Sequence, residues 1–105
     1  MSKIINKVNL GYLGSEYQYQ LVSTFINDPR FFTELFDIID QNMFTEVYLK
    51  KVVGIMKDYY NKYGLVPKYD MILLKMRETA NTEDDTEYCI EIINKLKAQT
   101  TDGIE

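Results

Sequence analysis

The sequence predicts an all-α fold, a small orthogonal bundle of about five helices. Three observations lead to this prediction. Apolar side chains recur three and four residues apart along most of the 105 residues, as on one face of an α-helix. There are only five glycines and two prolines, too few for a turn-rich β-sandwich. No Asn-Gly or Asp-Gly pair joins two alternating apolar segments, as it would in a β-hairpin.

Residues 1–14 are expected to form an N-terminal arm, and residues 15–97 a single helical head domain. The first helix begins at Ser15, a predicted N-cap that Gln18 would complete as a capping box. It ends at the sequence Asn27-Asp28-Pro29. Asp28 can cap the next helix there, and proline fits a first helical position.

The second helix is predicted over Pro29–Asp40, because its apolar residues have the spacing of one buried stripe. Gln41-Asn42 breaks this helix, and Thr45 is the predicted cap of the third. The stripe consists of Phe32, Leu35, Phe36 and Ile39.

The third helix, Glu46–Tyr63, is the longest and has a wide apolar face, which suits a central helix with neighbours on both flanks. Gly64 is the expected residue after its C-terminus, and Pro67 closes the exit. The main face consists of Leu49, Val52, Val53, Met56, Tyr60 and Tyr63. A second stripe lies beside it and consists of Tyr48, Ile55 and Tyr59. Burial in the core is one interpretation of this stripe, and a protein-binding surface is the other, because interfaces are enriched in tyrosine.

The fourth helix is predicted over Tyr69–Ala80, and Thr82 is expected to cap the fifth. Acidic residues then precede lysines along the fifth helix, an order that complements the helix dipole. Residues 98–105 are expected to be a frayed tail. The predicted core consists of Phe25, Phe32, Phe36, Val53, Met56, Leu73 and Ile93.

The composition excludes several classes of site. The absence of histidine excludes Ser-His-Asp and Cys-His catalysis, and a single cysteine, Cys89, excludes Cys₄ zinc sites and intramolecular disulfides. Cys89 is expected to be a small core residue. The net charge of −4 predicts little direct binding of DNA. With no apolar run long enough for a membrane span and no signal peptide, we expect a cytoplasmic protein.

No catalytic, cofactor or metal site is predicted. The five glycines never approach the spacing of a phosphate-binding loop. The acidic run 83–87 lacks the glycine and ligand spacing of a calcium loop, so we interpret it as a solvated helix start. Lys50, Lys51 and Lys57 alternate with acidic residues and are interpreted as a solvated face rather than a nucleic-acid patch.

Several junctions follow an order found in a known family. An Asn27-Asp28-Pro29 junction leads into an aromatic-rich helix, Met43-Phe44 precedes the long helix, and that helix exits through residues 63–67, Tyr-Gly-Leu-Val-Pro. With these features, residues 15–96 resemble the N-terminal domain of DnaB-type replicative DNA helicases, and are closest in style to the phage T4-like hexameric helicases. Two departures, Leu21-Val22 where the family often has Leu-Gly and Lys68 where it often has a small polar cap, fit a phage-type or mobile-element protein.

The resemblance implies an assembly role in DNA replication. In that family the N-terminal domain forms a collar on one face of the hexamer, with a helical head, a hairpin that pairs subunits, and contacts to primase or the helicase loader. ATP and Mg²⁺ belong to a separate motor domain. By this resemblance the chain is the head alone, a monomer or weak dimer by itself. The alternative is a free-standing helical adaptor of a phage or mobile element, whereas an enzyme would need a pocket with carboxylates of raised pKa.

Overall fold

The structure is a computed structural model and describes residues 14–103, with side chains as far as Gln99. The all-α prediction is confirmed: this part of the chain forms five α-helices and one short 3₁₀ helix, and it contains no strand. The predicted arm lies outside the described residues, apart from Gly14. The helices are α2 (Ser15–Asn27), α3 (Pro29–Glu34), α4 (Val47–Tyr63), α5 (Tyr69–Glu78) and α6 (Glu83–Gly103), with η2 (Gln41–Met43) between α3 and α4.

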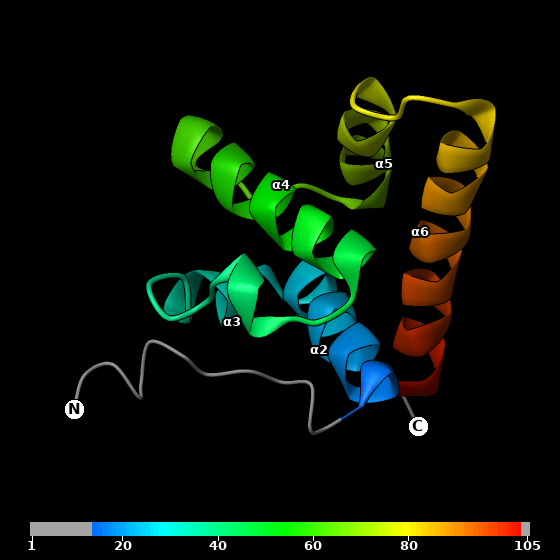
Figure 1. The fold of residues 1–105 in the computed structure, drawn as a ribbon. Coiled ribbons are helices and arrows are strands. Elements are labelled where there is room, and N and C mark those ends of the chain that lie inside the picture. The colour runs from blue at the N-terminus through cyan, green and yellow to red at the C-terminus, as the bar shows by residue number, and fades with distance from the viewer. Residues whose placement is uncertain (1–13, 104–105) are drawn as a thin grey trace.

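The helices are not all aligned, because α4 runs obliquely to the others (Figure 1). α6 packs along α2 and α5, and α4 crosses over α2 with α5 on its other flank (Figure 1). In the described residues, no helix is both long and apolar enough to cross a membrane. This arrangement buries one side of every long helix and leaves the outer flanks of α4, α5 and α6 open.

The core draws on all five α-helices. Five of the seven predicted core residues are buried, but Phe36 and Leu73 are only half-buried and pack against its edge. Phe36 lies in the turns that follow α3, at the edge of the core, where its ring contacts those of Phe32 and Tyr60. The largest fully buried side chains are Phe25, Phe32, Phe44, Leu49, Met56, Ile72, Met76, Ile93, Leu96, Gln18, Val22 and Val52.

The predicted second helix is too long, since α3 ends at Glu34 and residues 35–38 form turns. These turns bury Ile39 at 2% exposure and leave Ile38 exposed at 68%. The amino group of Lys57 on α4 donates a hydrogen bond to the Ile39 carbonyl and lies 4.6 Å from the centre of the Phe36 ring. Lys57 thus satisfies a backbone carbonyl directly after the turns, so a side chain of α4 helps to stabilise this segment.

Two predicted helix caps are wrong for one shared reason. Gly14 precedes α2 with no side-chain cap, and α4 starts after Glu46 rather than after Thr45. Gln18, predicted to cap its own helix, is fully buried and turned toward α4. Its Oε1 accepts from the backbone N–H of Thr45 at 3.0 Å, and its Nε2 donates to the Thr45 hydroxyl at 2.8 Å. A glutamine from α2 therefore satisfies the backbone at the start of α4.

Other predicted boundaries hold. The Asp28 carboxylate accepts from the Phe31 N–H, and the Thr82 hydroxyl accepts from the Asp85 N–H at 3.0 Å. Gly64 has the left-handed backbone conformation, with φ of 71°. At the C-terminal ends the predictions miss: α5 stops at Glu78, two residues before the predicted end, and α6 continues through Gly103 where a frayed tail was expected.

Candidate functional site

The three residues of the predicted interface stripe do not form one surface. Tyr48, Ile55 and Tyr59 are all half-buried on α4, but their neighbours differ. Tyr48 packs against α6, whereas Ile55 and Tyr59 line a cleft shared with α5. The stripe is therefore divided between two sites, one at each end of α4.

The Tyr48 end is fixed by a hydrogen bond. The Tyr48 hydroxyl donates to Asp85 Oδ1 at 2.6 Å, and the Tyr48 ring meets the Tyr88 ring edge-to-face with centroids 4.7 Å apart. The hydrogen bond raises the pKa of Tyr48 to about 12 and holds the pKa of the Asp85 carboxyl below its ordinary value. Tyr48 is thus a structural link between α4 and α6.

An acidic hollow lies beside this link, with a volume of about 330 Å³. Its carboxylates come from the first turns of α6, where acidic residues favour the helix dipole. Among the described side chains, no group of three or more carboxylate, thiol or imidazole ligands is placed to hold a metal ion. The hollow is lined by Tyr48, Thr82, Asp84, Asp85, Glu87, Tyr88 and Glu91.

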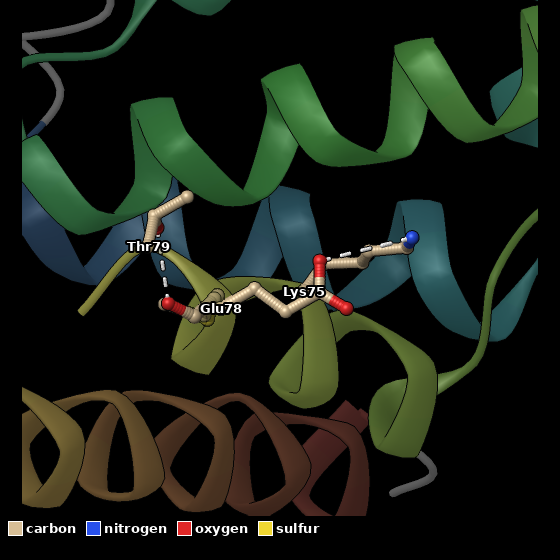
Figure 2. A network of polar contacts seen from close by, with 4 residues as sticks. Lys75, Glu78 and Thr79 are labelled. Atoms are coloured by element: carbon tan, nitrogen blue, oxygen red, sulfur yellow. Dashed lines mark hydrogen bonds and ion pairs between the residues drawn. The ribbon is translucent and has the colours of Figure 1, made fainter.

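A second hollow, which we name the α4–α5 cleft, has a volume of about 200 Å³. It is lined by Ile55, Asp58, Tyr59, Lys62, Tyr63 and Lys75. The Tyr59 and Tyr63 rings lie 4.6 Å apart between centroids. Figure 2 shows Lys75 on α5, where its amino group lies 3.9 Å from a Glu78 carboxylate oxygen. Both members of that ion pair are well exposed, so Lys75 is only weakly held there.

Large apolar side chains are exposed around the end of α4 and on α5, and apolar spacing did not predict their exposure. Tyr63 is 53% exposed, although its spacing placed it on the main apolar face of the third helix. Leu65, just after α4, is 64% exposed, and Leu74 on α5 is 50% exposed. The sequence signal for the exposure of Tyr63 was its position on the last turn of the helix, directly before Gly64. Fewer neighbouring elements cover the side chains at a helix end.

Two of the three lysines predicted to form a solvated face make specific contacts. Lys57 binds the Ile39 carbonyl, and Lys51 donates to the Thr79 hydroxyl at 3.3 Å, so neither is purely solvated. The same Thr79 hydroxyl donates to the Met76 carbonyl at 3.1 Å at the end of α5 (Figure 2). Cys89 is fully buried and is confirmed as a core residue, and burial raises the pKa of its thiol.

The two hollows differ in what they can bind. The hollow at the start of α6 carries only acidic charge among its lining side chains, whereas the α4–α5 cleft combines two lysines and one aspartate with exposed tyrosine rings. Aromatic side chains flanked by charge are typical of protein-binding surfaces.

A comparison of the chain with protein-family models, with curated proteins and with solved structures found no match.

Proposed function

We propose that this chain is a protein-docking module without chemistry of its own, and that the α4–α5 cleft is its main partner surface. The observation that carries the proposal is the exposed ring of Tyr63 beside Tyr59, with Lys62 and Lys75 at the edge of the cleft. A tyrosine buries a large area at low entropic cost when a partner covers it, because its side chain has few rotatable bonds.

The specific role we propose is that of the head in the N-terminal collar of a hexameric replicative DNA helicase. The support is the sequence resemblance of residues 15–96, with which the all-helical fold agrees. The partners would be neighbouring helicase subunits and a primase or helicase loader. In a ring, the other domains hold the heads close together, so that a small and weak surface is sufficient for assembly.

The alternative is a free-standing helical adaptor of a phage or mobile element. The mixed lining of the α4–α5 cleft favours it as much as it favours the collar, since a polar and charged surface of this size suits a transient partner. In both roles the α4–α5 cleft is the docking surface. In the collar role a helicase motor domain belongs to the same polypeptide, whereas in the adaptor role it does not.

The complete reading frame that contains this chain separates the two roles. The helicase proposal expects a Walker-type loop downstream of residue 105, ATP hydrolysis by the purified protein, and hexamers in sedimentation velocity that decrease when residues 1–105 are deleted. A reading frame without such a loop would overturn the helicase role in favour of the adaptor. Hexamers that persist unchanged after the deletion would contradict docking by this domain.

The isolated chain is expected to bind DNA negligibly at physiological salt. Its net charge is −4, and two of the lysines on α4, Lys51 and Lys57, are engaged by other parts of the protein. Fluorescence anisotropy with a labelled forked oligonucleotide measures this directly. A submicromolar affinity with a steep salt dependence would instead make α4 a nucleic-acid surface.

A further inference from the structure

One outer face of α6 is strongly acidic, and its carboxylates have no cationic partner among the described side chains. The tyrosine on this face, Tyr88, contacts the Tyr48 ring edge-to-face and is otherwise open. Asp84, Glu87, Tyr88 and Glu91 are separated by three and four residues, so they lie on one face of the helix, and we name this set the α6 acidic face. All four are exposed, and Tyr88 is 48% exposed. None of the three carboxylates forms an ion pair with a side chain that the structure describes. Like charges at this spacing repel one another, so a cationic partner would relieve the repulsion.

The α4–α5 cleft has the complementary character. Lys62 and Lys75 outnumber Asp58 in its lining, and exposed Tyr63 and half-buried Tyr59 provide an aromatic wall. Lys62 makes no ion pair in the described part of the chain; its amino group lies 5.6 Å from the centre of the Tyr63 ring. Since Lys75 is held only by an exposed and long ion pair, both lysines are available to an incoming carboxylate.

The two surfaces cannot meet within one molecule. They share no residue, and α5 lies between the C-terminal end of α4 and α6 (Figure 1). Their complementarity can therefore be satisfied only between molecules.

We propose that the α6 acidic face of one copy docks into the α4–α5 cleft of a second copy. Tyr88 enters beside Tyr59 and Tyr63, while Glu87 and Glu91 pair with Lys62 and Lys75. The inference rests on the proposed function and names a second copy as the occupant of the cleft. Because two different surfaces meet, a docked pair keeps one free cleft and one free acidic face, and the contact propagates into a ring or a chain. The hollow is small and the charges are exposed, so association of the isolated chain is weak.

The test uses two variants of the 105-residue chain that each remove one side of the contact. Lys62→Gln with Lys75→Gln neutralises the cleft, and Glu87→Gln with Glu91→Gln neutralises the α6 acidic face. Sedimentation velocity at low salt, from micromolar to millimolar concentration, follows their association. Each variant alone should need a concentration about tenfold higher than the unmodified chain to associate. An equimolar mixture should form a one-to-one dimer that grows no further, because one intact cleft and one intact acidic face remain.

Two control variants match the charge changes away from both surfaces. Arg30→Gln with Lys68→Gln removes two exposed basic charges, and Glu34→Gln with Asp37→Asn removes two exposed acidic charges. Both should associate like the unmodified chain. Unchanged association of the two test variants would overturn the inference, and so would a mixture that stays monomeric. If the complete protein still forms hexamers that depend on residues 1–105, the docking function stands and the cleft holds a different partner.

Discussion

The two ends of α4 carry the same kinds of side chain but meet different surroundings. Near the N-terminus, Leu49 is fully buried and the hydroxyl of Tyr48 is held by Asp85 on α6. Near the C-terminus, Tyr59 and Tyr63 face an open cleft whose far wall is the lysine-bearing edge of α5. Helical periodicity decides which residues share a face, whereas the neighbours at each turn decide whether that face is covered. The covered end of α4 stabilises the fold, and the open end is the one available for binding.

The largest expected contrast comes from truncating one residue at each end. Leu49→Ala should lower the free energy of unfolding by about 2–5 kcal/mol, since it leaves a cavity at a fully buried site. Tyr63→Ala should change the free energy of unfolding by no more than about 0.5 kcal/mol, because its side chain is half exposed. Urea denaturation measures both values. If Tyr63→Ala were as costly as Leu49→Ala, the open end of α4 would be part of the core.

The start of α4 depends on a side chain from another helix. Gln18→Leu should lower the free energy of unfolding by about 1–3 kcal/mol, because the Thr45 N–H and hydroxyl lose their buried partner. The matched control is Gln20→Leu, two residues away on α2 and exposed. Equal effects of the two substitutions in urea denaturation would show that the contact between Gln18 and Thr45 contributes nothing.

The end of α4 depends on backbone conformation rather than on packing. Gly64→Ala should lower the free energy of unfolding by about 1–2 kcal/mol, because a side chain is disfavoured at its φ of 71°. No atom lies within contact distance of a side chain added there, so the cost is conformational alone. Thermal and urea denaturation should agree on the loss. A neutral substitution would mean that the turn after Tyr63 relaxes at no cost, and the open end would be more adaptable than the structure indicates.

The smallest expected effect is a pH dependence at the covered end. The pKa of Tyr48 is about 12 in the folded protein against 10.0 ordinarily, so its hydrogen bond stabilises the fold below about pH 10 and is lost as the pH rises toward 12. The lowered pKa of Asp85 has the opposite sense, and its contribution is lost as the pH falls below about 4. Tyr48→Phe removes the first dependence and the largest part of the second, since the Asn81 N–H still donates to Asp85 in the variant.

The measurement is the difference in unfolding free energy between the unmodified chain and the Tyr48→Phe variant. This difference should shrink above pH 10 and below pH 4, and it should be largest between those limits. All other ionisable groups are the same in the two proteins, so their contribution to the difference cancels. A constant difference across the whole range would contradict the link between Tyr48 and Asp85.

Much of the fold could be predicted from local sequence signals. Apolar spacing predicted the helices, while Asp28, Gly64 and Thr82 marked boundaries through bonds made within a few residues. The helix caps that were predicted wrongly depend on contacts between residues far apart in the sequence. Gln18 has the spacing of a local capping box, but its partners are 27 and 28 residues away.

The candidate site was predicted only in part. Spacing placed Tyr48, Ile55 and Tyr59 on one stripe, and the stripe exists, but α6 covers one end of it and leaves the other open. Spacing likewise placed Tyr63 on the main apolar face of the same helix, yet its side chain is 53% exposed. Lys62 and Lys75 carry no sequence signal of their own, because only the packing of α5 beside α4 brings them to one cleft.

The central claim is that the open end of α4 serves binding and not stability, and Tyr63→Ala in the complete protein tests it most directly. The control is Tyr17→Ala, another exposed tyrosine, which lies on α2. Sedimentation velocity measures assembly, and urea denaturation of the 105-residue chain measures stability. We predict that Tyr63→Ala weakens assembly by about tenfold, with the free energy of unfolding unchanged within about 0.5 kcal/mol, while Tyr17→Ala changes neither. Unchanged assembly of the Tyr63→Ala protein would contradict the account.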